Sequence, residues 1–396
     1  MQRQPSLSTL TKPVLPMPDP AARAHSARVV AAVRQAIVGA GGFLSLERYL
    51  ARVLYAPGLG YYVSGTAKFG PEGDFVTAPE LSPLYGRSIA AQIDAVLAST
   101  SGRQLVELGA GSGALAADVL NELGERGALP ASYAIVEVSA PLRALQRATL
   151  EARAAAHVDR VAWLDAPPAH IEGAIVMNEV LDAVPCHVIV RREGHWMERG
   201  VVAHGEGLAI DERPLLDERL RALAAARFPP HIDYASEVNP AAEALVLSLA
   251  QSLRRGALLV MDYGFPRAEY YHPQRREGTL VGHYRHRVHA DPLLWPGLSD
   301  LTAHVDFTAM AEAGERGGLH VAGFTSQAAF LLGCGIVDLL ARSGAPSEAA
   351  YLRAAAAVQQ LTSPAEMGEL FKVLALARNE DIEWPGFTLS DRTDRL

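Results

Sequence analysis

The feature that most constrains the fold is the stretch LVELGAGSGALAADV at residues 105–119, where an apolar segment is followed by three closely spaced glycines. Gly109, Gly111 and Gly113 carry no Cβ atom, so the backbone of this bend can pass close to a bound ligand. A strand, a glycine-rich turn and a helix are typical of doubly wound α/β sheets. The frame ending at Ala114 also satisfies the dinucleotide fingerprint G-x-G-x-x-G/A. This loop alone therefore leaves a nicotinamide enzyme, a methyltransferase and a plain packing turn open.

Acidic residues follow the next two predicted strands. Residues 133–138 (YAIVEV) predict a buried strand that ends near Glu137, where a carboxylate can accept from two ribose hydroxyls. A further strand at residues 161–164 ends at Asp165. Dinucleotide and methyltransferase cofactors both contain a ribose, so Glu137 fits either class.

A polar cluster, NEVLDAVP at residues 178–185, follows the predicted strand at 173–177. In open α/β sheets ligands bind outside the carboxyl ends of the strands, so Asn178, Glu179 and Asp182 are site candidates by position. The alternative is that Asn178 caps a helix and that the two acids lie in its first turn, beside the positive end of the helix dipole.

Composition narrows the function classes. The 396 residues are 49% hydrophobic and 20% charged, which is enough for a large core, and we expect one catalytic domain with added pieces. The formal net charge of −8 gives no basic face, which argues against binding to duplex DNA or RNA. A negative net charge is compatible with a basic segment of another protein as partner.

Metal, disulfide and membrane features are not predicted. Cys186 and Cys334 are too few for a disulfide framework or a cysteine-rich zinc site. The histidine-rich run HYRHRVH at 283–289 predicts a solvated or substrate-side loop. No stretch approaches the ~18 apolar residues of a membrane span, and the first 20 residues lack the apolar region of a signal peptide. We expect residues 1–20 to form a flexible tail.

Periodicity and cap signals give the expected elements. Helices are predicted at residues 21–39, 45–54, 81–98, 215–228, 241–253, 326–332 and 348–360. Strands are predicted at residues 104–108, 187–191, 195–202, 257–262, 320–325 and 371–377. The expected organisation is a helical N-terminal region at 21–100, a core at 101–185 and 237–396, and an inserted subdomain at 186–236.

A series of motifs in fixed order carries a family resemblance. They are GYYV at 60–63, GDFVTAPELSPLYG at 73–86, ELGAGSGALAADVL at 107–120, VEVSAPLRALQ at 136–146, NEVLDAVP at 178–185, MDYG at 261–264, DLTAHVDFTAM at 300–310 and MGELFKVLALAR at 367–378. In these motifs the chain resembles the MidA family of class I S-adenosylmethionine-dependent methyltransferases. It departs from the family at Val180 and Leu181, where aromatic residues are frequent, and it shows no mitochondrial presequence, which favours a cytoplasmic bacterial-type member.

The resemblance implies a Rossmann-like α/β sheet of seven strands, S-adenosylmethionine as cofactor and no metal. Residues 321–325 and 371–377 would then form the antiparallel pair that closes the sheet. In a dinucleotide enzyme the last strands of the sheet are more often parallel, so an antiparallel pair here would distinguish a methyltransferase from a dinucleotide enzyme.

The resemblance also implies roles for cofactor-binding residues. Gly109, Gly111 and Gly113 would approach the amino-acid portion of the cofactor, and Glu107 would support that loop or contact the cofactor ammonium through water. Glu137 would accept from the ribose, and Asp165 would lie near the adenine edge. In the family the segment 73–80 covers the cofactor, which assigns Thr77, Pro79 and Glu80 to the site or its lid. Alternatively, residues 77–80 cap the following helix and Glu107 and Asp165 only cap loops.

For the acceptor, the family implies an arginine of a protein partner, by analogy a respiratory-complex subunit. A guanidinium is cationic and a poor nucleophile, so carboxylates should orient it. Glu179 and Asp182 are the candidates, with Asn178 as a positioning group and His304 as part of a proton exit route. A cofactor-binding assembly factor with little turnover is a second hypothesis, and an NAD-linked oxidoreductase is a third.

Overall fold

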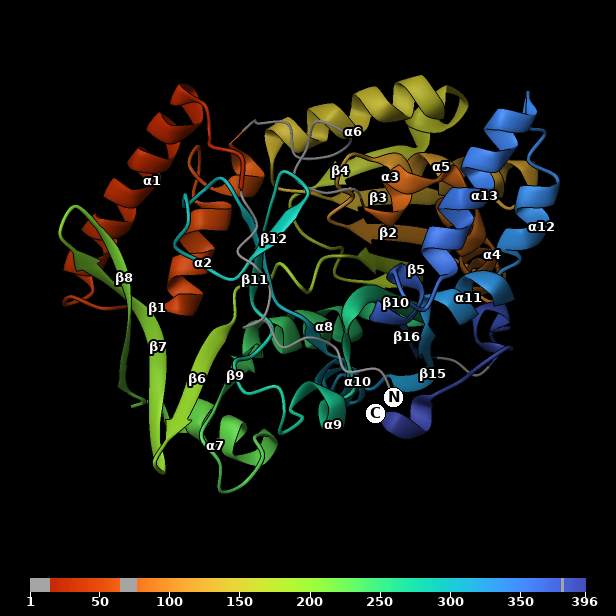
Figure 1. Cartoon of the computed structure of the whole chain (residues 1–396). Helices are drawn as coiled ribbons and strands as arrows, with labels where there is room; N and C mark the ends of the chain where they lie inside the picture. Colours follow the sequence, from red (N-terminus) through yellow and green to blue (C-terminus); the bar gives the residue numbers. More distant parts are fainter. Residues whose placement is uncertain (1–14, 65–76, 379–380) are drawn as a thin grey trace. The chain divides into compact units, whose positions relative to one another are not determined.

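The computed structural model of the chain describes residues 15–64, 77–378 and 381–396 (Figure 1). The chain divides into two compact units. The first unit comprises Met1–Val76, Ala183–Ala241 and Ala268–His304, and the second comprises Thr77–Asp182, Ala242–Arg267 and Val305–Leu396. Both units are assembled from three separated segments, so these boundaries differ from those predicted. Residues 21–76 of the predicted N-terminal region and the expected insertion fall in the first unit, whereas residues 77–100 fall in the second.

The second unit is built on a sheet whose main path has the order β15-β16-β10-β5-β2-β3-β4. Its strands are β2 (Gln104–Leu108), β3 (Ser132–Val136), β4 (Val161–Leu164), β5 (Ile171–Asn178), β10 (Leu253–Phe265), β15 (His320–Ser326) and β16 (Phe371–Ala377). Strands β4, β3, β2, β5 and β10 are parallel neighbours, whereas β16 runs antiparallel to both β10 and β15. The predicted seven-stranded arrangement with its closing antiparallel pair is confirmed. A short strand, β14 (Val305–Asp306), also pairs with β10.

Helices pack on both faces of this sheet. They are α3 (Ala78–Leu81), α4 (Pro83–Ala98), α5 (Ala114–Glu125), α6 (Ala140–Arg153), α8 (Pro240–Ser252), α10 (Phe307–Arg316), α11 (Gln327–Gly333), α12 (Ile336–Ala341), α13 (Glu348–Thr362) and α14 (Met367–Leu370). Side chains alternate between the faces of a strand. Leu259 and Met261 of β10 pack toward α4 and α5, whereas Leu376 of β16 lies against Gly314 of α10. The sheet is therefore covered on both sides, as in doubly wound α/β folds.

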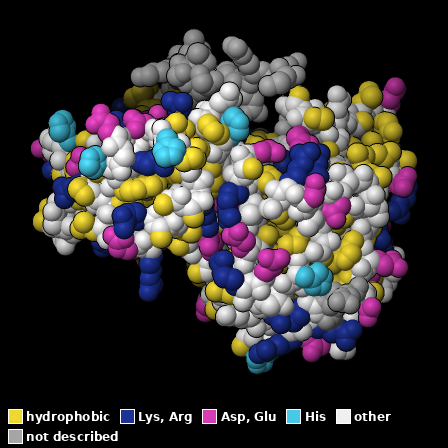
Figure 2. All heavy atoms as spheres, turned by 90° about the horizontal axis from the view of Figure 1, so that it is seen from below, with side chains coloured by type: hydrophobic (Ala, Val, Ile, Leu, Met, Phe, Trp, Pro, Cys, Tyr) yellow, Lys and Arg dark blue, Asp and Glu magenta, His cyan; other side chains and the backbone are white. Residues whose placement is uncertain are grey.

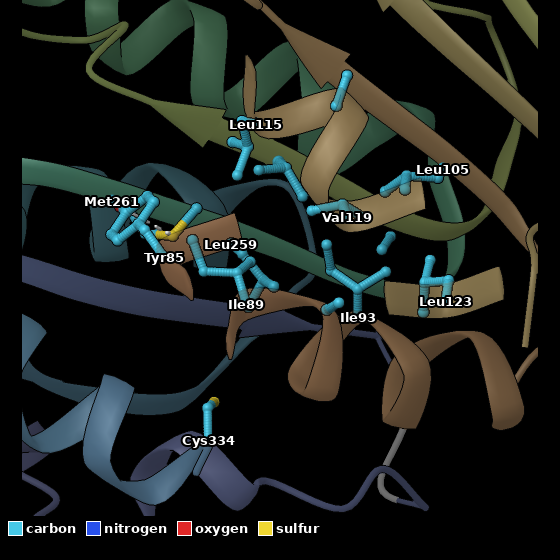
Figure 3. Close-up of a cluster of buried hydrophobic side chains, with 14 of the residues drawn as sticks. Tyr85, Ile89, Ile93, Leu105, Leu115, Val119, Leu123, Leu259, Met261 and Cys334 are labelled. Atoms are coloured by element: carbon cyan, nitrogen blue, oxygen red, sulfur yellow. Dashed lines mark hydrogen bonds between the residues drawn. The ribbon is translucent and has the colours of Figure 1, made fainter. Parts of the chain in front are cut away.

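The core of the second unit follows from helical spacing. Tyr85, Ile89 and Ile93 recur every four residues on α4, so they share one face, and Figure 3 shows them facing side chains of α5 and of the sheet. The other labelled members are Leu105, Leu115, Val119, Leu123, Leu259, Met261 and Cys334. Burying each large apolar side chain contributes roughly 1.5–3 kcal/mol before the entropy cost of folding. This cluster fixes α4, and hence Tyr85, against β10.

The first unit combines helices with two antiparallel sheets. Its elements are α1 (Pro20–Gly39), β1 (Leu44–Ser45), α2 (Leu46–Tyr55), β6 (His187–Arg192), β7 (His195–His204), β8 (Gly207–Pro214), α7 (Glu218–Arg227), β9 (Tyr234–Val238), α9 (Arg267–Tyr270, which begins in the second unit), β11 (Val281–Tyr284), β12 (Arg287–His289) and β13 (Asp300–Thr302). One sheet has the order β1-β7-β6-β9 with β8 paired to β7, and the other has the order β12-β11-β13. Leu44 of β1 pairs with Val201 of β7, which explains why the first part of the predicted N-terminal region and residues 186–236 belong to one unit.

The run HYRHRVH, expected as a solvated or substrate-side loop, is a β-hairpin in which residues 285–288 are exposed. Residues of this run form a hairpin of β11 and β12, in which His283 pairs with Val288. Arg285 and His286 at its turn have positive φ, a backbone conformation that the residue pattern did not signal. His289 is buried, with its Nε2 atom 3.0 Å from Ser299 Oγ.

Neither a metal-binding cluster nor a membrane-spanning helix occurs within residues 15–64, 77–378 and 381–396. No group of three or more His, Cys, Asp or Glu side chains in that part of the chain could hold a metal ion. Among the described helices, none combines the length and the hydropathy needed to cross a membrane.

Candidate functional site

The glycine loop between β2 and α5 adopts a backbone conformation that favours glycine. Gly109, Gly111 and Gly113 have φ values of 63°, 53° and 87°. Gly113 occupies the N-cap position of α5, and a Cβ atom there would lie 3.0 Å from Cα of Gln146. The loop is thus held against α6, with its backbone in the left-handed region at all three glycines.

The loop that follows β3 contains Glu137, which is buried. Its Oε1 atom accepts from the backbone N–H of Ser139 at 2.8 Å, and its Oε2 atom accepts from Nε2 of Gln146 at 3.2 Å. An ionised carboxylate has about four acceptor positions, so these two bonds leave acceptor capacity for ligand hydroxyls.

Glu107 and Asp165 lie in contrasting environments. Glu107 on β2 is 2% exposed, and its Oε2 atom accepts from the Tyr133 hydroxyl at 2.6 Å. Burial raises the pKa of Glu107 to about 7, an effect that the Tyr133 hydrogen bond partly opposes. Asp165, directly after β4, is exposed and forms an ion pair with Arg143, whose guanidinium lies 2.6 Å from Oδ1.

The described part of the predicted covering segment reaches the glycine loop. Glu80 of α3 accepts a hydrogen bond from the hydroxyl of Ser112, which lies between Gly111 and Gly113. Pro79 is buried, and Thr77 occupies the N-cap position of α3 without making a side-chain cap bond among the described residues. The remainder of the segment, residues 73–76, lies outside the described residues.

The polar cluster after β5 is an irregular loop, so the alternative of a capped helix is wrong. The backbone N–H groups of Leu181 and Asp182 donate to Oδ2 of Asp262, at 3.0 and 3.3 Å. Asp262 belongs to β10, about eighty residues further along the chain. A long-range carboxylate thus takes the place of a local helix cap.

Asn178 and Glu179 are fixed by contacts with two other elements. The Tyr85 hydroxyl of α4 donates to Oδ1 of Asn178 at 2.5 Å, and Nδ2 of Asn178 lies 3.3 Å from Oε1 of Glu179. The Glu179 N–H donates to the carbonyl of Met261 at 2.9 Å. Glu179 has φ of 52°, which costs a non-glycine residue of order 1–3 kcal/mol and often marks functional sites.

Two carboxyl groups of this loop, Glu179 and Asp182, interact with the carboxyl group of Asp262 on β10. Burial raises the pKa of Asp262 well above its ordinary value, and the negative charges of Asp182 and Glu179 raise it further. Burial and the charges of Glu179 and Asp262 likewise raise the pKa of Tyr85. Asp182 and Asp262 are buried and Glu179 is half-buried, and clusters of acids with raised pKa values are a feature of functional sites.

Sequence reasoning assigned no role to Tyr85 or Asp262. Both residues lie in the motifs quoted for the family, Tyr85 near the end of GDFVTAPELSPLYG and Asp262 in MDYG. The position of Asp262 near the carboxyl end of a predicted apolar strand was the available signal. Tyr85 could be connected to the site only through the packing of α4.

His304 is the last residue of the first unit, whereas Asn178, Glu179 and Asp182 belong to the second. Its backbone N–H donates to Oγ1 of Thr279 at 3.0 Å. The grouping of His304 with the carboxylate loop stays a prediction.

Comparison with known proteins decides the family. A profile described as "Putative S-adenosyl-L-methionine-dependent methyltransferase" matches residues 84–325. The chain belongs to this family. It is an S-adenosylmethionine-dependent methyltransferase, as the motifs predicted, and the NAD-linked alternative is set aside.

Similar proteins match this methyltransferase over most of its length. The mitochondrial protein arginine methyltransferase NDUFAF7 of Mus musculus is 30% identical over 376 residues, which cover 85% of this chain and 81% of the relative. The Drosophila melanogaster homologue is 30% identical over 368 residues, with 85% and 82% covered. A Burkholderia thailandensis protein crystallised with S-adenosyl-homocysteine is 46% identical and has a TM-score of 0.92. The match covers 96% of this chain and 100% of that protein.

The glycine loop is suited to S-adenosylmethionine. Its left-handed glycines present backbone without side chains, and the buried carboxylate of Glu137 follows the adjacent strand. These are the two elements that a ligand with a ribose needs at the carboxyl edge of such a sheet.

Proposed function

We propose that this methyltransferase methylates an arginine side chain of a protein partner, with Glu179 and Asp182 binding the guanidinium. The observation that carries the proposal is the carboxyl cluster of Glu179, Asp182 and Asp262 at the carboxyl ends of β5 and β10. The names of the NDUFAF7 relatives support arginine as the acceptor. A cytoplasmic location and a respiratory-complex subunit as partner stay predictions.

The proposed cofactor site consists of the glycine loop and the loops beside it. Gly109, Gly111 and Gly113 would let the backbone approach the cofactor, and Glu137 would accept from its ribose. When bound, S-adenosylmethionine supplies an electrophilic methyl group on a sulfonium. The other proposed contacts are Thr77, Pro79, Glu80, Glu107 and Asp165. Glu80 is supported by its hydrogen bond to Ser112 in the glycine loop.

The proposed acceptor chemistry follows from the charge of a guanidinium. Its positive charge is delocalised over three nitrogens, so a carboxylate that accepts from one N–H favours a lone pair on another. Glu179 and Asp182 would accept these N–H groups, and one of them would take the proton that the methylated nitrogen loses. Asn178 would keep Glu179 in place, because its amide lies 3.3 Å from that carboxylate. Holding the acceptor in line with the methyl group is the main demand of a displacement reaction.

Asp262 would act as a positioning residue. Its Oδ2 atom accepts from the N–H groups of Leu181 and Asp182, and its Oδ1 atom accepts from the N–H of Tyr263 at 2.9 Å. These bonds fix the backbone that carries Asp182. A fixed carboxylate loses little orientation freedom when the acceptor binds.

The experiment is methyl transfer from labelled S-adenosylmethionine to protein fractions by Glu179→Gln and Asp182→Asn. Each amide keeps the shape of the side chain and removes its charge, so turnover should fall by about 10²-fold or more. Binding of S-adenosylhomocysteine should change little. Glu315→Gln, an exposed carboxyl of α10, is the matched control and should keep wild-type turnover.

Two outcomes contradict the proposal. Full turnover in both amide variants would remove the carboxylates from the mechanism. Tight cofactor binding by the wild-type protein, without transfer to any fraction, would favour the assembly-factor hypothesis.

A further inference from the structure

Gln146 of α6 is fully buried and makes three polar contacts with different elements. Its Nε2 atom lies 3.1 Å from the carbonyl oxygen of Gly111 and 3.2 Å from Oε2 of Glu137. Its Oε1 atom accepts from Nε1 of Trp163 on β4 at 2.9 Å. One amide therefore joins the glycine loop, the loop after β3 and strand β4.

The orientation of this amide is determined by its partners. The indole N–H of Trp163 can only donate, so it must face the amide oxygen of Gln146. The carbonyl of Gly111 and the carboxylate of Glu137 can only accept, so both must face the amide nitrogen. The guanidinium of Arg147 lies over the Trp163 ring, 4.3 Å from its centroid, and helps to hold the indole.

We propose that Gln146 is a positioning residue for S-adenosylmethionine, and that Trp163 sets its orientation. The inference rests on the proposed cofactor site, in which Gly111 and Glu137 approach the ligand. Both donor contacts of Gln146 go to these two residues, so the amide fixes the separation of the glycine loop and the ribose-binding carboxylate. The backbones of the glycine loop and α6 are also packed closely together, because a Cβ atom at Gly113 would lie 3.1 Å from the backbone carbonyl oxygen of Gln146.

The contacts explain why a glutamine is suited to this position. A glutamate would keep the acceptor for Trp163 but would place a second negative charge beside Glu137. A methionine would fill a similar volume but would leave the Gly111 carbonyl, the Glu137 oxygen and the Trp163 N–H without their partner. Both changes should widen the range of geometries that Glu137 adopts, and so weaken cofactor binding.

The test is calorimetric titration of S-adenosylhomocysteine into Gln146→Met and Trp163→Phe, each studied well below its melting midpoint. We expect Kd to rise about 10–100-fold for Gln146→Met. For Trp163→Phe we expect a rise of about 3–10-fold, because this variant keeps the glutamine but removes the N–H that sets its orientation. In turnover assays KM for S-adenosylmethionine should rise with Kd, while kcat at saturation should stay within about threefold of wild type. The control is Gln360→Met, at an exposed glutamine of α13.

Glu137→Gln separates failure of the inference from failure of the cofactor site. If Glu137→Gln weakens binding but Gln146→Met and Trp163→Phe bind as the wild type does, Gln146 is only a structural residue and the inference is overturned. If Glu137→Gln also binds as the wild type does, the proposed cofactor site is wrong and the inference fails with it. In the expected case, the double variant Gln146→Met/Glu137→Gln loses less affinity than the sum of the two single losses, because both act on one contact.

Discussion

Several acidic side chains of the second unit are buried, and their pKa values are raised. Burial raises the pKa of Glu107 and of Asp118 to about 7, although the Arg153 ion pair opposes the shift at Asp118. Asp262 shows the same direction, with additional repulsion from its neighbours. Ionising such groups costs free energy of folding, and shifts of this kind occur both at functional sites and in structural ion pairs such as that of Asp118 with Arg153.

Glu107 should therefore make stability depend on pH. Its carboxyl ionises near 4.5 in the unfolded chain but only near 7 in the folded protein, so its contribution is complete below pH 4.5 and is lost as pH rises through about 7. Glu107→Gln cannot ionise and still accepts from Tyr133. Its stability relative to wild type should improve between pH 5 and pH 8, by at most about 2–3 kcal/mol. Melting curves of the cofactor-free protein at both pH values, with Glu315→Gln as control, check this. An equal difference at the two pH values would contradict it.

Asp182→Asn should separate stability from activity. Removing one negative charge beside Asp262 relieves repulsion between buried acids, so the variant should melt a few degrees higher than wild type at pH 8. Turnover should fall at the same time, as proposed above. Melting at pH 8, with the exposed Asp338→Asn as control, measures the first effect. A lower melting temperature would show that Asp182 mainly stabilises the loop.

At the scale of elements, sequence periodicity predicted the strands that have strong apolar patterns. The bounds predicted for 104–108, 161–164 and 371–377 agree with β2, β4 and β16, because these strands are short apolar runs between clear turn signals. Strands β8, β9 and β11 to β13 were missed. They lie in first-unit sheets, where pairing with another strand (β8 with β7, β9 with β6, β12 with β11), rather than the local apolar pattern, determines the structure. The loop after β5 could not be predicted for the same reason, since Asp262 supplies its hydrogen bonds from another strand.

The beginnings of β5 and β10 depend on two glycines. Gly173 has φ of 153°, and a Cβ atom there would lie 1.8 Å from the carbonyl oxygen of Gln104 on β2. A Cβ atom at Gly256 would lie 1.9 Å from the carbonyl oxygen of Gly173. These backbone atoms cannot move without breaking the parallel ladder of the sheet.

Gly173→Ala should therefore lose about 3 kcal/mol of stability or more, or fail to fold. Gly39→Ala is the control, because a Cβ atom at that helical glycine meets nothing within 4 Å. It should leave stability unchanged or raise it slightly. Thermal unfolding followed by circular dichroism gives both values. Wild-type stability of Gly173→Ala would contradict the close approach of β2 and β5.

At the scale of the whole molecule, the chain passes repeatedly between two units, and the proposed cofactor contacts all lie in the second. Figure 2 shows Lys and Arg side chains interspersed with Asp and Glu on the face in view. On this face charges of both signs are mixed, so the net charge of −8 is not gathered there as one acidic patch. Acceptor choice should then depend on local contacts near the carboxyl cluster more than on long-range attraction.

Cofactor binding should raise the stability of the folded protein. A ligand at about 100 times its Kd adds about 2.7 kcal/mol if only the folded state binds it. S-adenosylhomocysteine should therefore raise the melting temperature of the full chain in a concentration-dependent way, whereas NAD should not. Thermal scans over a range of ligand concentrations measure this, and an equal response to NAD would contradict the ligand selectivity.

The most direct test of the central claim is identification of the methylated residue. Proteins of a host strain that lacks the gene, and of the same strain carrying wild-type or Glu179→Gln protein, would be compared by mass spectrometry for methylated arginine. The account predicts at least one arginine methylation that is lost without the gene, restored by the wild-type protein and not restored by Glu179→Gln. Restoration by Glu179→Gln, or a gene-dependent methyl group on a residue other than arginine, would contradict it.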